Sequence, residues 1–191
     1  MKFVETKWYS QLIQISDYIL LGILWVIVSL PIITVIPASA AVFETMTHWS
    51  NGESGRVVFF FWQGFKKKLG INLVLSFLTG SIYFLTNLMV QESSIVLVVS
   101  GYVVMIIYTM FLLSWLICLS QSKQQSIVRL FQESTMFVLI NFLKNGLCCV
   151  VLLTFTLFVF MFPPIIFLLA GGVWCLIYQL MNNQRVKGVW Q

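Results

Sequence analysis

Four long stretches without a charged side chain constrain this chain more than any other feature of its sequence. They cover residues 18–43, 69–91, 93–122 and 145–184, and the 11 basic and 6 acidic residues all lie outside them. A helix needs about 20 apolar residues to cross the roughly 30 Å hydrocarbon core of a bilayer. Each stretch is long enough for one crossing and the last is long enough for two, so the chain is a polytopic membrane protein.

The composition supports this class and argues against nucleic-acid binding. Only 9% of the residues are charged and 60% are hydrophobic, whereas a soluble domain carries about 25% charged residues. The net charge of +5 comes from basic residues that flank the uncharged stretches, as the positive-inside rule describes. We therefore expect one membrane domain over residues 1–191 and no nucleic-acid partner.

Helix length and proline positions predict an all-α fold with about five transmembrane helices. Pro31 should kink or end the first helix near Leu30, and Pro37 should stop what remains of it. Pro163 and Pro164 should divide the last stretch into two helices joined by a tight turn. The expected spans are about 18–36, 70–90, 95–119, 146–162 and 165–181.

Three further segments have the pattern of amphipathic helices at the membrane interface. The segment 38–50 places Val42, Met46 and Trp49 on one face, with polar side chains over much of the rest. The segment 57–65 is rich in aromatic residues and follows a turn at 51–55. The third segment, 123–141, carries its apolar side chains on one side and includes Lys123 among its polar ones.

Short basic, aromatic sequences before the second and fourth spans suggest an internal repeat. Residues 65–69 read FKKKL and residues 142–146 read FLKNG, and each follows an amphipathic segment and leads into a pair of spans. Parallel repeats occur in transport folds. The alternative is that every cytoplasmic entry into a membrane is basic and aromatic.

The distribution of basic residues predicts the orientation. With five spans, only Lys2 and Lys7 fall on one side of the membrane. The positive-inside rule then places the N-terminus outside and the C-terminus in the cytoplasm. Four spans would separate Lys144 from Arg185 and weaken this bias. The basic residues that share the cytoplasmic side are Arg56, Lys66, Lys67, Lys68, Lys123, Arg129, Lys144, Arg185 and Lys187.

The N-terminal region also has the outline of a signal peptide, with early lysines and an A-x-A sequence at 38–40. A signal peptide has an apolar region of roughly 7–15 residues, and the uncharged stretch 18–43 is longer. Glu5 and Asp17 also dilute the basic character of the N-terminus. We expect an uncleaved first span.

Few side chains are of the types that catalyse reactions or bind metal ions. Glu44 and His48 lie four residues apart and share a helix face, and Glu53 is near in sequence, so the three could ligate a metal or move a proton. His48 is the only histidine, and we interpret the group as the polar face of an interfacial helix, with no metal and no cofactor. The sequence contains no G-x-x-x-x-G-K-[ST], G-x-S-x-G or H-E-x-x-H motif.

The spans contain amides and hydroxyls but no charge. Residues such as Asn72, Ser114 and Thr154 can form hydrogen bonds between helices or line a small polar path, and we favour the packing role. Gly171 and Gly172 should form a close-packing patch in the last span. Membrane lipids are expected partners, although the three lysines at 66–68 are fewer than the 4–8 of specific lipid-binding clusters.

One region resembles a known family. Residues 29–41 read SLPIITVIPASAA, residues 52–53 read GE and residues 61–66 read FWQGFK, which is similar to the YesL-like integral membrane proteins of Gram-positive bacteria, a domain of unknown function. The resemblance implies a multi-pass protein of the bacterial cell membrane, whose members are often encoded beside carbohydrate ABC importers. The positions that carry the family pattern, and are candidates for interaction, are Pro31, Pro37, Glu44, Gly52, Glu53, Trp62, Phe65 and Lys66.

Three functions remain open on the sequence. The first is a non-enzymatic accessory subunit that binds the permease subunits of a carbohydrate ABC importer and stabilises or regulates them. The second is a self-sufficient facilitator or channel for a small polar solute. The third, a membrane enzyme, lacks a recognisable reactive group and would be revived by loss of an activity on mutation of His48 or Glu44. The sequence does not predict an oligomeric state.

Overall fold

The chain folds into helices joined by short connections. The computed structural model describes residues 7–53, 55–67, 69–91, 94–121 and 126–182, and within these residues every regular element is helical. The expected all-α fold is confirmed. The elements are α1 (Lys7–Ser29), the short 3-10 helix η1 (Ile32–Thr34), α2 (Val35–Ser50), α3 (Val57–Lys66), α4 (Leu69–Gln91), α5 (Ile95–Gln121), α6 (Ile127–Ile140), α7 (Phe142–Met161) and α8 (Ile165–Asn182).

Five helices, α1, α4, α5, α7 and α8, are long and apolar enough to cross a membrane. The last four begin and end within a few residues of the expected spans, and the turn at Pro163 and Pro164 is present. The first span was placed wrongly at both ends. α1 starts at Lys7 because nothing before Tyr18 interrupts a helix. It ends at Ser29, which confirms the expected break near Leu30 but leaves the residues up to Ile36 outside this helix.

The two prolines after α1 have different roles. Pro31 lies two residues after the end of α1 and precedes η1 with extended backbone angles, as expected from its restricted geometry. Pro37, which we expected to stop the helix, lies in the first turn of α2. The first four N–H groups of a helix have no intrahelical partner, so a proline at this position costs no hydrogen bond and the helix continues through it.

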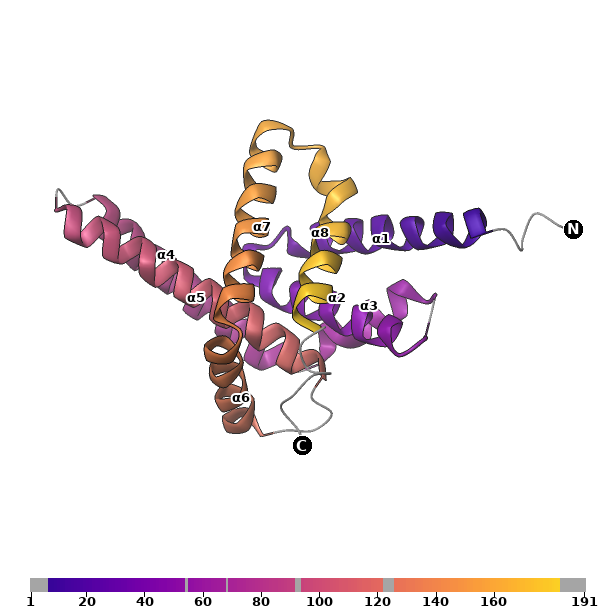
Figure 1. Ribbon diagram of the computed structural model, residues 1–191, viewed down its shortest axis with the longest axis horizontal. Coiled ribbons are helices and arrows are strands. Elements are labelled where there is room, and N and C mark those ends of the chain that lie inside the picture. Colours follow the sequence, from indigo (N-terminus) through magenta and orange to yellow (C-terminus); the bar gives the residue numbers. More distant parts are fainter. Residues whose placement is uncertain (1–6, 54, 68, 92–93, 122–125, 183–191) are drawn as a thin grey trace, which may run out of the picture.

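Figure 1 shows three arms that diverge from a common centre. α1 projects to one side, the α4–α5 hairpin to the other, and the α7–α8 hairpin rises between them. α1 and α8 cross each other. α3 and α6 lie in the lower part of the view, away from the α7–α8 turn. The order of a short helix followed by a long hairpin occurs twice, as α3–α4–α5 and α6–α7–α8.

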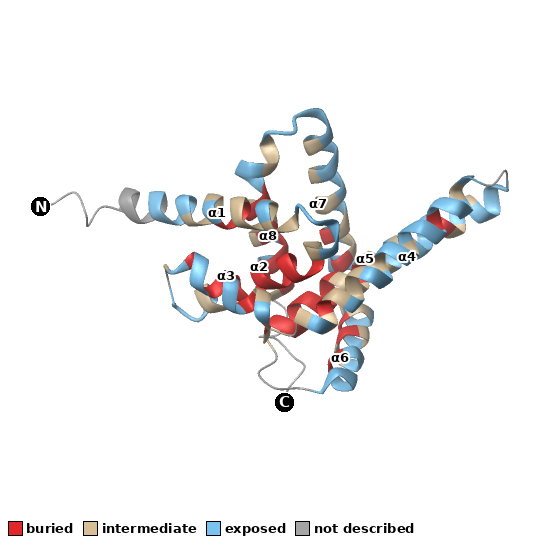
Figure 2. Cartoon of the chain, turned by 180° about the vertical axis from the view of Figure 1, so that it is seen from behind, coloured by how far each residue is buried: buried red, intermediate tan, exposed pale blue. Residues whose placement is uncertain are grey.

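The centre of the molecule is α2, which is packed against α1, α3, α4, α5 and α8. Its residues from Ile36 to Met46 are all buried, and they form part of the buried centre in Figure 2. The expectation of an interfacial amphipathic helix over 38–50 was therefore wrong. Of the polar side chains that suggested a wet face, Glu44 is buried and Thr47 and His48 are half-buried by neighbouring helices, which the local sequence does not reveal.

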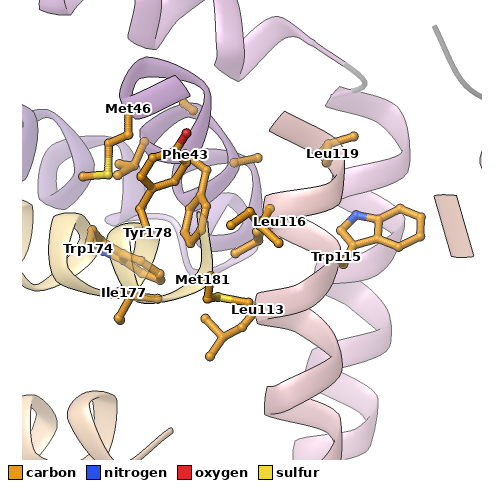
Figure 3. Packing of buried hydrophobic residues seen from close by; sticks show 14 of the residues in the cluster. Phe43, Met46, Leu113, Trp115, Leu116, Leu119, Trp174, Ile177, Tyr178 and Met181 are labelled. Atoms are coloured by element: carbon orange, nitrogen blue, oxygen red, sulfur yellow. The ribbon is translucent and has the colours of Figure 1, made fainter. Parts of the chain in front are cut away.

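Aromatic and aliphatic side chains join α2 to α5 and α8. The ring of Phe43 meets Trp174 and Tyr178 edge-on, with centroids 5.7 and 5.9 Å apart. Figure 3 shows these rings from α2 and α8, with Leu113 and Leu116 of α5 in the same cluster. Edge-to-face pairs of this kind add about 0.5–1.5 kcal/mol beyond the burial of their area.

Glycines allow α1 and α8 to cross closely. A Cβ atom added at Gly22 would lie 2.8 Å from the backbone nitrogen of Gly171, and one added at Gly171 would overlap the carbonyl oxygen of Tyr18. Small residues permit such backbone approach between membrane helices. The predicted close-packing patch is confirmed at Gly171, whereas a Cβ atom at Gly172 would meet nothing within 4 Å.

α6 is shorter than the expected segment 123–141, and Lys123 lies outside the described residues. It buries Leu130, Ser134 and Phe137. Ile127 and Phe131, which we placed on the same apolar side, are more than half exposed. The buried face of α6 is thus narrower than its apolar face.

Candidate functional site

The charged side chains of α2 meet those of α3 and its flanking residues. Lys67, just after α3, donates hydrogen bonds from Nζ to both carboxylate oxygens of Glu44, at 2.8 and 2.9 Å. The Glu44 residue is only 9% exposed. A carboxylate with so little access to water needs a charged and hydrogen-bonded partner, and Lys67 supplies both the charge and the hydrogen bonds.

His48 lies one helical turn after Glu44 and extends this ion pair. Its Nδ1 lies 2.8 Å from Oε2 of Glu53, where the ring donates to the carboxylate. Its Nε2 lies 3.9 Å from Oε1 of Glu44, which is too far for a hydrogen bond. The imidazole also stacks on the ring of Phe60, with centroids 4.3 Å apart and planes at 7°. We call Glu44, His48, Glu53 and Lys67 the ion cluster.

Gly64 lets α3 lie close enough to α2 for the ion cluster to form. A Cβ atom at this position would come within 2.7 Å of Cβ of Glu44 and 3.0 Å of Cα of Ala41. The buried face of α3 consists of Val57, Phe60, Phe61 and Gly64. The ion cluster then fixes both ends of α3, with Glu53 before the helix and Lys67 after it.

The outer face of α3 is apolar and basic. Trp62 stacks on Phe65, with centroids 5.5 Å apart, and Nζ of Lys66 lies 5.9 Å from the centroid of the Trp62 ring. The geometry is a cation–π contact. Trp62 and Lys66 are exposed and Phe65 is half-buried, so these candidate residues belong to the surface and not to the ion cluster.

The structure brings together only part of the candidate set. Glu44 and Glu53 meet through His48, as their spacing suggested, and Gly52 turns the chain between them with a φ of 88°. Pro31 and Pro37 lie before and within the first turn of α2, where they shape the backbone.

Sequence reasoning missed Lys67 as the partner of Glu44. It also missed the roles of Phe60 and Gly64. A glycine within an otherwise aromatic helix was the one signal that could have indicated the close contact.

The ion cluster has the chemistry of a structural network. A His held by a carboxylate is the arrangement of a general base, yet the second nitrogen of His48 faces Glu44 and no hydroxyl or thiol. In the part of the chain that the structure describes, no group of three His, Cys, Asp or Glu side chains is arranged to hold a metal ion. The charged groups pair with one another, Glu44 with Lys67 and Glu53 with His48.

Polar side chains in the spans mostly bond to their own helices. Thr79 and Thr154 each donate to the carbonyl four residues earlier. Asn145 of α7 donates to Ser114 of α5 at 3.2 Å, which confirms packing between helices for this pair. Asn72 is fully buried and neither atom of its side-chain amide has a partner among the described residues.

A hollow of about 940 Å³ lies between η1 and α4. Its walls are the aliphatic side chains of Ile32, Ile33 and Ile36 on one side and the outer face of α4 on the other. The hydroxyls of Ser76 and Thr79 at this hollow bond to backbone carbonyls of α4. The hollow is therefore apolar in chemistry and offers little to a polar solute.

Comparison with known proteins gives one match. Residues 18–89 match the family model described as protein of unknown function, DUF624. This segment of the chain is similar to the DUF624 family. DUF624 is the YesL-like family, so the resemblance seen in the sequence is confirmed. No curated protein and no solved structure matches the chain.

The DUF624 segment runs from α1 to α4 and contains the whole ion cluster. It also contains η1 and the hollow beside α4. The hairpin α7–α8 and the helix α6 lie outside it. The features that distinguish the described structure chemically, the paired charges and the tightly packed glycine at position 64, are thus features of the DUF624 segment.

Proposed function

We propose that this DUF624 protein is a non-enzymatic accessory subunit of the bacterial cell membrane that binds the permease subunits of a carbohydrate ABC importer and stabilises or regulates them. The choice of importer follows from what the family resemblance implies about neighbouring genes. The choice of a binding role follows from the surface described next.

The observation that carries the proposal is the apolar outer surface of two helices too short to span a bilayer. α3 has 10 residues and α6 has 14, which correspond to about 15 and 21 Å of helix. Val58 and Trp62 on α3 are 56% and 49% exposed, and Val128, Phe131 and Met136 on α6 are exposed as well. Exposed apolar surface that is not part of a span marks a protein or membrane contact.

Electrostatics favours the cytoplasmic side for this surface. Arg56 and Lys66 flank α3, Arg129 lies on α6, and Lys144 lies in the first turn of α7. The positive-inside rule assigns such a cluster to the cytoplasm. A subunit with this surface would contact the permease where that protein enters the membrane from the cytoplasm.

The ion cluster suits α3 to a binding role. Because both ends of α3 are held on α2, its outer face is presented in a fixed geometry. Binding then costs less conformational entropy than it would for a mobile helix. The cluster supports binding by positioning α3 and needs no reaction of its own.

The test is purification of the tagged full-length chain from its native cells in a mild detergent, with mass spectrometry of the recovered proteins. We expect permease subunits in stoichiometric amount, and at least a tenfold loss of recovery for Trp62→Ala. Phe160→Ala is the matched control, because Phe160 is 88% exposed at the far end of α7. Recovery of the chain alone from both wild type and control would contradict the proposal.

The alternative is a self-sufficient facilitator for a small polar solute. It receives less support, because most hydroxyls of the spans bond to their own backbones or, as with Thr79 and Tyr108, to another helix, and the hollow beside α4 is apolar. Liposomes containing only this protein separate the two functions. Solute flux above that of empty liposomes would favour the facilitator, and sealed liposomes would favour the accessory subunit.

A further inference from the structure

A second hollow, of about 510 Å³, lies at the corner between α2 and α3. It shares His48 and Glu53 with the ion cluster and adds side chains that the cluster does not use. Its volume falls within the 300–1,000 Å³ of typical small-molecule sites. The lining residues are His48, Glu53, Arg56, Phe59, Phe60 and Gln63.

The backbone of the connecting loop is shaped to form this hollow. Gly52, Gly55 and Arg56 all have positive φ, at 88°, 80° and 52°. Glycine adopts such angles readily, but an arginine in the left-handed region is strained, and strain of this kind concentrates at functional sites. The loop turns back so that the backbone N–H of Glu53 donates to the carbonyl of His48 at 3.1 Å.

The polar groups at the hollow include both donors and an acceptor. Arg56 and Gln63 are exposed, and within the described part of the chain no side chain is paired with either of them. Glu53 shares one carboxylate oxygen with His48 and keeps lone pairs for a further donor. The charges of Arg56 and Glu53 balance, so the hollow does not select a strongly charged ligand.

The aromatic groups provide an apolar wall. His48 covers one face of the Phe60 ring, and Phe59 meets Phe60 edge-on, with centroids 5.8 Å apart. Phe59 is 60% exposed and therefore offers a ring face to a ligand. A site with one aromatic wall and several convergent donors and acceptors suits a molecule that has both C–H surfaces and hydroxyl groups.

We propose that this hollow binds a neutral saccharide, with Arg56 and Gln63 donating to its hydroxyl oxygens, Glu53 accepting from a hydroxyl group, and Phe59 covering an apolar ring face. The biological role of this site rests on the proposed function: the site would sense the imported sugar at the cytoplasmic face. The chemistry of the lining residues carries the ligand class independently, because Glu53 offsets the charge of Arg56 and leaves no net attraction for a free phosphate or carboxylate.

The test measures binding to the purified full-length chain in lipid nanodiscs by calorimetry and saturation-transfer NMR. The neutral probes are glucose, galactose, sucrose and maltose, and the charged probes are glucose 6-phosphate and glucuronate. We expect saturable binding of at least one neutral sugar and weaker binding of the charged probes. Binding of the charged probes alone, or no saturable binding of any neutral sugar, would overturn the proposal.

Two variants locate the site. Arg56→Gly removes the guanidinium and also relieves the strained backbone, so it should fold at least as well as the wild type. Gln63→Ala removes an exposed amide. Loss of the charged donor of Arg56 should weaken sugar binding by about tenfold to a hundredfold, and loss of the neutral amide of Gln63 by about twofold to tenfold. Arg129→Ala, an exposed cation on α6, is the control and should bind normally, and equal affinity of all variants would overturn the site.

The outcome is separable from that of the proposed function. Sugar binding is measured on the purified chain without any partner, while the subunit role is measured by co-purification. Permease recovered with a chain that binds no sugar would refute the saccharide site and support the accessory-subunit role. Sugar binding by a chain that recovers no permease would support the saccharide site and refute the accessory-subunit role.

Discussion

α2 and α4 show opposite relations between sequence and burial. α2 contains a glutamate, a histidine and several hydroxyl residues, yet its residues from Ile36 to Met46 are buried by other helices. α4 is uncharged and rich in leucine and phenylalanine, yet it buries only Asn72 and Thr86. Figure 2 shows the contrast between the buried centre, to which the C-terminal half of α5 belongs, and the exposed outer part of the α4–α5 hairpin.

This difference shows which residues hold a membrane protein of this kind together. Lipid is as apolar as leucine, so apolar side chains gain little by leaving lipid for protein. Small residues that let helices approach, and polar groups that need partners, are what favour contact between helices. The buried part of α2 accordingly includes alanines, hydroxyl residues and one paired glutamate beside core side chains such as Phe43 and Met46, while most of the long apolar side chains of α4 face outward.

The largest loss of stability is expected from a mutation at the crossing of α1 and α8. A methyl group at Gly171 would overlap the carbonyl oxygen of Tyr18, so Gly171→Ala should destabilise the protein by about 3 kcal/mol, the upper range for overpacking. Thermal and denaturant unfolding in detergent micelles measure this loss. Gly172→Ala is the matched control, since its Cβ atom meets nothing within 4 Å, and equal destabilisation of both variants would refute the crossing.

The second effect concerns the charge buried in α2. Glu44→Gln should cost about 2 kcal/mol, less than the 3–5 kcal/mol of a fully buried pair, because the side chain of Lys67 is 27% exposed. Lys67→Met in the same chain should recover part of the loss, and the double-mutant cycle gives the coupling energy. Lys66→Met serves as the control, and a coupling indistinguishable from zero would contradict the ion pair.

A smaller change in stability is expected when a glycine in the centre of the molecule is replaced, and a glycine in α4 provides the comparison. Gly64→Ala places a Cβ atom 2.7 Å from Cβ of Glu44 and should destabilise by about 1–2 kcal/mol. Gly80→Ala in α4 meets nothing within 4 Å and should be neutral or stabilising by up to about 1 kcal/mol, because alanine favours a helix. Unfolding of the two variants side by side measures the difference, and its reversal would contradict the packing of α3 on α2.

The smallest effect is expected on the outer face of the arm. Leu85 is 59% exposed beside the hollow between η1 and α4, so Leu85→Ala should change the stability of the purified protein by less than about 0.5 kcal/mol. A loss well above 1 kcal/mol in unfolding experiments would show that this face is covered, and the contrast with α2 would then need revision.

The sequence predicted the long helices well because length, charge and proline act locally. The uncharged stretches fixed α4, α5, α7 and α8 to within a few residues, and the two prolines at 163–164 located the turn between the last two. The outer aromatic helix at 57–65 was also correct. These features depend only on neighbours along the chain.

The packing of α2 could not be predicted in this way. Glu44 and His48 have the pattern of a wet helix face, and only the position of Lys67, 23 residues after Glu44, makes the burial of Glu44 tolerable. We expected Pro37 to stop a helix. Its position in the first turn of α2 depends on where η1 ends, and the local sequence does not show that boundary. Both errors come from contacts or boundaries that local pattern does not contain.

The most direct test of the account is site-specific photo-crosslinking in native cells. A photoreactive amino acid at Val58 of α3 or Met136 of α6 should give an adduct with the importer permease, identified by mass spectrometry. The same amino acid at Phe160 of α7 should give none, since this exposed position lies at the far end of the arm. Adducts from Phe160 alone, or none from α3 and α6 in a correctly inserted protein, would contradict the proposal that the short helices form the partner surface.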